Sequence, residues 1–92
     1  MIYLEFGKEK SKGRMYSEAD KLMNNAYYNN PKNDYQHYYN CIVHYHKALN
    51  YYYWGKKTKT FEYYEKIKKE SYSFPKLKYH SHDLKKKLKI RL

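Results

Sequence analysis

The chain has 92 residues, and its 20 lysines and arginines exceed its 9 aspartates and glutamates to give a formal net charge of +11. This length is sufficient for one small domain with a modest core, so we expect a single domain over residues 1–92. The single cysteine excludes an internal disulfide, and no apolar run approaches the roughly 18 residues that span a bilayer.

Tyrosine dominates the apolar content, with 15 residues of this type. A tyrosine ring packs like an apolar group, but its hydroxyl must stay wet or hydrogen-bonded. A core built from tyrosine is therefore shallow, and we expect it to complete its burial against neighbouring proteins in a larger assembly. A net charge of +11 on so small a protein is self-repulsive, so we expect a polyanionic partner. The alternative is a lysine-rich surface that serves solubility alone.

The N-terminal stretch "MIYLEF" alternates Ile2, Leu4 and Phe6, which is typical of a short strand. With the polar segment "GKEKSKGR" that follows, it predicts an extended arm over residues 1–15. The stretch lacks the roughly 7–15 apolar residues of a signal peptide. We therefore expect a cytoplasmic protein, with a mitochondrial assembly left open.

A first helix is predicted after this arm. Ser17 and Asp20 match a capping pattern, and Pro31 within "NNPKND" ends the helix. Its apolar face recurs at helical spacing and consists of Ala19, Leu22, Met23, Ala26 and Tyr27.

A second, longer helix is predicted to begin at Asn33 or Asp34 and to run to Trp54, with Gly55 as its C-terminal cap residue. Its inward stripe is formed by Tyr35, Tyr38, Tyr39, Ile42, Tyr45, Leu49, Tyr52 and Tyr53.

A third helix is predicted to start near Thr58 or Thr60 and to end by Pro75. Its inward residues are Phe61, Tyr64 and Ile67. Two of its lysines follow a glutamate by four residues, a spacing that favours ion pairs: Glu62–Lys66 and Glu65–Lys69.

Residues 75–92 form a basic tail. Ser81 and Asp83 favour a helix carrying Leu84 and Leu88, while the last five residues are compatible with helix, with a strand paired to the N-terminal arm, or with disorder. The expected fold is all-α. It has a small three-helix body over residues 16–74, or four helices if the tail contributes one, and basic, partly extended N- and C-terminal segments.

Residues 41–72 resemble one degenerate tetratricopeptide repeat, a helix–turn–helix unit. Tyr51 and Tyr52 precede Gly55 as the paired aromatic residues and the turn glycine of that family do, and "EYYEKI" matches its closing run. Thr60 stands where that family has a small residue at the start of its second helix. His44 and Lys47 do not match the residues of the family's first helix. The separation of Ala19 and Thr60 exceeds the family's period of roughly 34 residues. The resemblance implies an antiparallel helical hairpin and a role in protein–protein scaffolding.

Basic segments with aromatic residues among them are the main functional signal. Each cation can neutralise a phosphate without reading sequence. The predicted RNA-phosphate-binding residues are Lys66, Lys68, Lys69, Lys76, Lys78, Lys85, Lys86, Lys87, Lys89 and Arg91, with a second group of Lys8, Lys10, Lys12 and Arg14. The predicted base-stacking residues are Tyr72, Phe74, Tyr79 and His80.

Lysine far outnumbers arginine, the usual residue for bidentate recognition of bases. Sequence-specific reading of DNA is therefore not expected. We expect a structural RNA-associated accessory protein, such as a small ribosomal or ribonucleoprotein subunit that binds rRNA. The alternative is a helical-hairpin adaptor or assembly subunit that binds proteins.

Other chemistry has little support in the sequence. His37, Cys41 and His44 share one helix face, but residues seven apart lie about 10.5 Å apart along a helix and cannot converge on one ion without bending it. No catalytic triad order and no phosphate-cradling glycine loop are present. We therefore expect no enzyme activity, no metal, no cofactor and no small-molecule substrate.

Overall fold

The computed structural model describes residues 2–89, which form five helices and no strand. The prediction of an all-α fold is confirmed. The helices are α1 (Ile2–Lys12), α2 (Tyr16–Asn24), α3 (Asp34–Tyr53), α4 (Lys57–Glu70) and α5 (Leu77–Leu88). The expected body of three or four helices is therefore too small, because both terminal segments contribute a helix.

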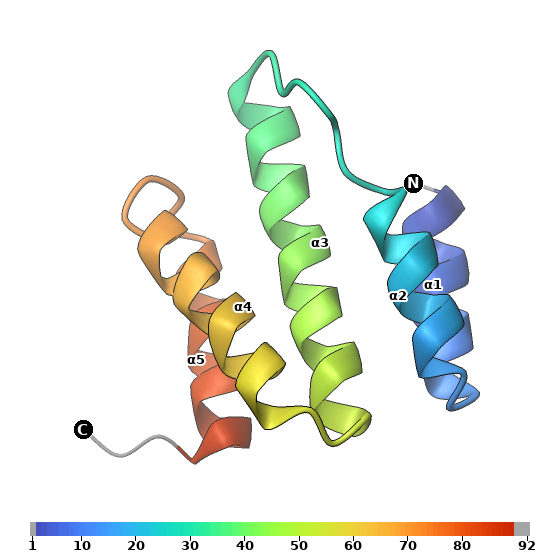
Figure 1. The fold of residues 1–92 in the computed structure, drawn as a ribbon. Coiled ribbons are helices and arrows are strands. Elements are labelled where there is room, and N and C mark those ends of the chain that lie inside the picture. The colour runs from blue at the N-terminus through green and yellow to red at the C-terminus, as the bar shows by residue number, and fades with distance from the viewer. Residues whose placement is uncertain (1, 90–92) are drawn as a thin grey trace.

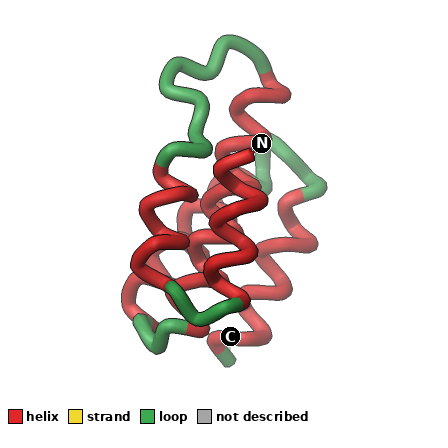
Figure 2. The backbone as a smooth tube through the Cα atoms, turned by 90° about the vertical axis from the view of Figure 1, so that its right-hand side faces the viewer, coloured by secondary structure: helices red, strands yellow, loops and turns green. Residues whose placement is uncertain are grey.

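The long helix α3 lies at the centre, with the α1–α2 hairpin on one side and the α4–α5 hairpin on the other (Figure 1). The loops lie towards the ends of the helices (Figure 2). The Cα atoms extend over 36 × 32 × 16 Å, so the molecule is a flat slab. A slab this thin lets most residues reach solvent on one face or the other.

Two hydrophobic cores flank α3, and Ile42 packs against both. The first lies between α3 and the α1–α2 hairpin, and the second between α3 and the α4–α5 hairpin. The buried members of the first core are Leu4, Ala19, Met23, Ala26, Tyr39 and Val43. Those of the second are Cys41, Ala48, Tyr64, Ile67, Leu77 and Leu84.

The N-terminal segment is helical, so the prediction of an extended arm over residues 1–15 is wrong. Leu4 and Gly7 are buried, one helical turn apart, whereas Ile2 and Phe6 are exposed. The three alternating apolar residues therefore lie on two faces of a helix, with Leu4 on the inner face and Ile2 and Phe6 on the outer face. The strand pairing considered for the last residues of the chain falls largely on residues 90–92, which lie outside the described part.

Gly7 of α1 packs directly against Ala19 and Met23 of α2. A Cβ atom built at this glycine would lie 2.8 Å from Cγ of the fully buried Met23 and 3.3 Å from the Ala19 carbonyl oxygen. The short distance between α1 and α2 therefore requires a residue without a side chain at position 7.

Replacing Gly7 with alanine is expected to destabilise the protein by about 1–2 kcal/mol. The gain of up to about 1 kcal/mol in helix propensity is smaller than the typical overpacking cost of about 1–3 kcal/mol. Urea unfolding measures the difference. Gly13→Ala is the control, because the nearest atom to its Cβ lies 3.6 Å away. A stabilised Gly7→Ala protein would show that the α1–α2 contact is loose.

Helix α2 begins without the predicted cap. Its N-cap residue is Met15, which makes no side-chain hydrogen bond, and Ser17 lies inside the first turn. Asp20 contacts α3 instead of capping its own helix. The capping interpretation of Ser17 and Asp20 is therefore wrong, because a tertiary partner takes the carboxylate.

The ends of α3 follow the sequence prediction closely. The Asn33 side chain accepts a hydrogen bond from the Gln36 backbone N–H at 2.9 Å and caps the helix. Beyond the other end, Gly55 has φ of +85°, and the Lys56 N–H donates to the Tyr51 carbonyl at 2.8 Å. This is a Schellman ending with glycine at the left-handed position.

The end of α1 has the same geometry with a different residue. The Met15 N–H donates to the Lys10 carbonyl at 2.9 Å, and the Arg14 N–H donates to the Ser11 carbonyl at 3.0 Å. Arg14 occupies the left-handed position with φ of +63°. A residue with a Cβ costs roughly 1 kcal/mol more than glycine in this conformation. The turn therefore carries an arginine where glycine is more stable.

The inward stripe of α3 is only partly as predicted. Tyr39 is buried, whereas Tyr35 and Tyr53 are exposed. Because α3 has a neighbour on each side, it buries residues on more than one face, including Val43 and Ala48.

Helix α4 starts at Lys57 and ends at Glu70, before the predicted limit at Pro75. Tyr64 and Ile67 are buried as predicted, but Phe61 is exposed. Neither expected pair of α4 forms an ion pair in the described structure. Helix α5 confirms the helix favoured for the first part of the tail.

Candidate nucleic-acid interface

The α4–α5 hairpin carries exposed lysines on both helices and on the turn between them. Lys66, Lys68 and Lys69 lie on α4, and Lys76 and Lys78 lie at the start of α5. No carboxylate of residues 2–89 forms an ion pair with any of these five. We call these residues, with Tyr72 and Tyr79, the hairpin face. Its amino groups are available to an external anion.

The other predicted cations of the tail differ in their surroundings. Lys86 and Lys89 are exposed, and Lys85 is half-buried. Lys87 forms an ion pair with Asp83 at 3.1 Å, and Asp83 also accepts a hydrogen bond from the Tyr45 hydroxyl at 2.5 Å. Lys87 is therefore partly neutralised within the fold. Arg91 lies outside the described residues.

The four predicted stacking residues fall into two pairs. Tyr72 and Tyr79 are 79% and 83% exposed, so their rings are accessible. Phe74 instead packs edge-on against Tyr38 at 5.9 Å between ring centroids. His80 packs edge-on against Tyr45 at 4.7 Å. The structure thus leaves the two tyrosines as the stacking candidates and gives the other two rings internal partners.

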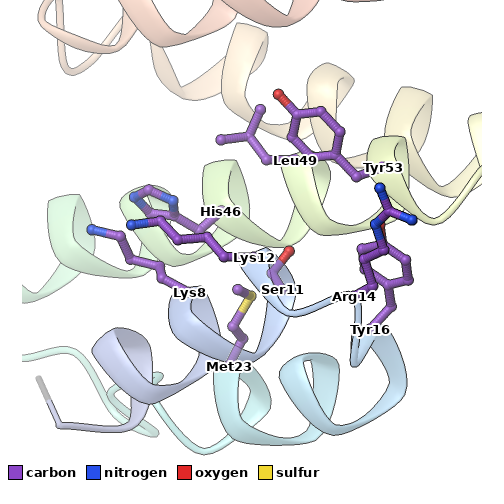
Figure 3. Close-up of a pocket in the computed structure, with 9 residues that line it drawn as sticks. All are labelled: Lys8, Ser11, Lys12, Arg14, Tyr16, Met23, His46, Leu49 and Tyr53. Atoms are coloured by element: carbon purple, nitrogen blue, oxygen red, sulfur yellow. The ribbon is translucent and has the colours of Figure 1, made fainter.

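Three of the four predicted N-terminal cations line one pocket of about 570 Å³ between α1, α2 and α3 (Figure 3). These are Lys8, Lys12 and Arg14. Lys10 does not line this pocket, and its amino group pairs with Glu18 of α2 at 3.4 Å. The structure therefore separates the predicted cations into two places, the hairpin face and this α1–α3 pocket.

A buried lysine at the junction of α2, α3 and α4 was missed by the sequence analysis. Lys47 is only 4% exposed, and its amino group lies 3.3 Å from Asp20 Oδ1 and contacts Asn24 Oδ1. Asp20 also accepts a hydrogen bond from the Tyr51 hydroxyl at 2.8 Å. The ion pair thereby joins α2 to α3.

Three tyrosine rings surround the same ammonium group. It lies 5.9 Å from the ring centroid of Tyr27, 5.8 Å from that of Tyr51 and 5.1 Å from that of Tyr63. These distances are within the range of cation–π attraction. The available signal was spacing, because Lys47 lies one turn from the buried Val43 and one turn from the buried Tyr51.

Two half-buried histidines of α3 have lowered pKa values. Burial, with Lys66 and Lys47 nearby, lowers the pKa of His44 to about 4. Its Nδ1 atom lies 2.7 Å from the Tyr27 hydroxyl, within hydrogen-bond distance. Burial and the Lys8 charge lower the pKa of His46 to about 4. Both imidazoles are therefore neutral at pH 7.

Cys41 and its neighbouring histidines on α3 line one pocket. His37, Cys41 and His44 share the lining of a pocket of about 330 Å³ with two lysines. Burial raises the pKa of the Cys41 thiol to about 11, so the thiolate is scarce at neutral pH. Within residues 2–89, no group of three or more His, Cys, Asp and Glu side chains is placed to hold a metal ion.

No family model, curated protein or solved structure matches this chain. The resemblance to a tetratricopeptide repeat consequently stays a prediction. In the described residues, no helix has both the length and the hydropathy needed to cross a membrane.

Proposed function

We propose that this protein is a structural RNA-associated subunit that binds RNA phosphates through the hairpin face, most simply as part of a ribosomal or other ribonucleoprotein particle. The observation that carries the proposal is the exposure of Tyr72 and Tyr79 on the same helical hairpin as five lysines that form no ion pair among the described residues. The lysines attract the phosphates of the RNA backbone, and the exposed rings stack on unpaired bases.

The chemistry of the hairpin face favours RNA recognised by shape and backbone rather than by sequence. All its cations are lysines, which act as point charges and lack the fork that reads guanine. Base stacking on tyrosine tolerates any base, because each base has a π face. A single-stranded or looped RNA segment is therefore the expected ligand.

The double variant Lys68→Gln/Lys78→Gln is expected to weaken binding of a single-stranded oligonucleotide by about tenfold at low salt. Each lost phosphate contact should also reduce the slope of log K against log salt by roughly 0.7. Fluorescence anisotropy across a salt series measures both. Lys21→Gln/Lys32→Gln is the control, because it removes the same charge from outside the hairpin face.

The stacking residues give an independent arm of the same experiment. Tyr72→Ala/Tyr79→Ala should weaken binding with little change in salt slope, by about 1–3 kcal/mol for each ring that stacks on a base. Tyr35→Ala, another exposed tyrosine, is the control. Equal binding by the hairpin-face variants and their controls would contradict the proposal.

A second candidate function, a protein-binding adaptor, is favoured by the outer surface of α1. Ile2, Tyr3 and Phe6 are all exposed there, close together along the first turns of the helix. Such a surface is suited to a neighbouring protein. Binding through apolar residues is largely insensitive to salt, so the same salt series separates the two functions.

A further inference from the structure

The α1–α3 pocket has two different ends. In Figure 3 the amino groups of Lys8 and Lys12 lie with the His46 ring towards one end, while Arg14, Tyr16 and Tyr53 lie towards the other. Leu49 contributes an apolar surface between them, and the buried side chain of Met23 lies beneath the pocket. The pocket thus combines a cationic end with an aromatic end.

The charges of the pocket favour an anionic ligand. Three cations line it, and no carboxylate does. The nearest acidic partners are Glu5, 3.5 Å from Lys8, and Glu9, 3.8 Å from Lys12. Both glutamates are exposed, and exposed pairs with a spacing of three residues are weak. An incoming phosphate, with up to two negative charges, can therefore displace them.

Arg14 gives a second, independent reason to assign a ligand to this pocket. Its backbone is in the left-handed conformation, where the equivalent turn after α3 has Gly55. The side chain that makes this conformation less favourable is one that lines the pocket (Figure 3). Backbone strain of this kind is often retained where a side chain serves a function.

The aromatic end is held in place by the fold. Asn50 is fully buried, and its side-chain amide donates to the Tyr16 carbonyl at 3.0 Å, which fixes the start of α2 on α3. The Tyr16 ring stacks on Trp54 at 6.1 Å between centroids. A planar ligand ring beside Tyr16 and Tyr53 would therefore meet a partly fixed surface.

We propose that the α1–α3 pocket binds one nucleoside monophosphate, with its phosphate at the Lys8–Lys12 end and its base beside Tyr16 and Tyr53. The neutral His46 ring and the Ser11 hydroxyl supply hydrogen-bonding groups for the ligand. A volume of about 570 Å³ falls within the usual range for small-ligand sites. The nucleotide is a free molecule or an unpaired nucleotide of an RNA strand.

Titration of the full chain with adenosine 5′-monophosphate tests this site. Trp54 is the only tryptophan and stacks on Tyr16, so its fluorescence reports on the aromatic end. We expect a saturable change, with adenosine and inorganic phosphate each binding at least about tenfold more weakly, because each occupies only one end.

Arg14→Gly is the decisive variant. It retains the turn, since glycine prefers that conformation, so its melting temperature should be no lower than that of the unmodified chain. Its affinity for adenosine 5′-monophosphate should fall by about tenfold, because the guanidinium at the aromatic end no longer packs against the base. Lys12→Gln, at the phosphate end, should cause a similar loss. Lys21→Gln, on the exposed side of α2, is the matched control and should bind normally.

Two outcomes would overturn the assignment. One is the absence of a saturable response to adenosine 5′-monophosphate, or a response that Arg14→Gly and Lys12→Gln leave unchanged. The other is equal or tighter binding of dodecyl phosphate through the same residues, which would assign the pocket to an alkyl chain. Neither outcome depends on the RNA affinity of the hairpin face.

The source of the nucleotide is distinguished with a 5′-phosphorylated adenylate hexamer, tested on Lys68→Gln/Lys78→Gln to reduce binding by the hairpin face. Tighter binding of the hexamer than of adenosine 5′-monophosphate, sensitive to Arg14→Gly, supports an RNA strand. Weaker binding of the hexamer supports a free nucleotide.

Discussion

Lys47→Ala is expected to lower the free energy of unfolding by about 3–5 kcal/mol, a large share of the roughly 5–15 kcal/mol that holds a small domain together. The substitution leaves Asp20 without its cation and opens a cavity among Tyr27, Tyr51 and Tyr63. Urea unfolding followed by circular dichroism at pH 7 measures the loss.

Two further variants separate charge from volume. Lys47→Met retains most of the side-chain stem, and the Tyr51 hydroxyl still donates to Asp20, so the loss should be about 1–3 kcal/mol. Lys21→Ala, on the exposed face of α2, should change stability by less than about 0.5 kcal/mol. A Lys47→Ala protein as stable as Lys21→Ala would contradict the role of the ion pair.

Acidification from pH 7 to pH 4.5 is expected to destabilise the protein by several kcal/mol through His44 and His46. In the folded state both pKa values are about 4, against an ordinary value of 6.5. As the pH falls below 6.5, the two histidines bind protons in the unfolded chain but stay neutral in the folded chain. The stability is therefore complete above about pH 6.5 and is lost progressively down to about pH 4.

The structure gives the causes and bounds the size of this effect. Burial is the main cause at both rings; Lys66 and Lys47 add to it at His44, while Lys8 and His80 add to it and Glu5 opposes it at His46. At about 1.4 kcal/mol for each pKa unit, each histidine contributes at most about 3 kcal/mol.

Thermal unfolding across this pH range, with NMR titration of the histidine rings, measures both quantities. His44→Gln and His46→Gln should each flatten the pH dependence. His37→Gln, which replaces an exposed histidine of the same helix, is the control. A ring pKa near 6.5 for His44 in the folded protein would contradict the prediction.

The sequence was most informative where local chemistry decides the structure. Asn33 and Gly55 mark the ends of α3 by hydrogen bonding and by backbone conformation, so both ends were predictable. Helix α1 was not, because alternation of three apolar residues fits a strand as well as a helix with two faces. The deciding fact is the fit of Gly7 against Met23 of α2, a contact that no local pattern contains.

The candidate sites divide in the same way. Clusters of lysine are visible in the sequence, but which of these lysines gather at one place depends on the packing of other helices. Lys10 pairs with Glu18, whereas Lys8, Lys12 and Arg14 converge on a pocket completed by α2 and α3. Lys47 is an extreme case, since a lysine is ordinarily solvated, and its carboxylate partner is supplied by Asp20 of another helix.

The sharing of α3 by two separate cores has a thermodynamic consequence. Either outer hairpin can detach in a sub-global opening that leaves the other core assembled, so local stability differs between the halves. Ligands on the α1–α3 pocket and on the hairpin face would each rigidify their own half. Communication between them must pass through the central helix, where Ile42 packs against both cores and Lys47 links α2 to the ring of Tyr63 on α4.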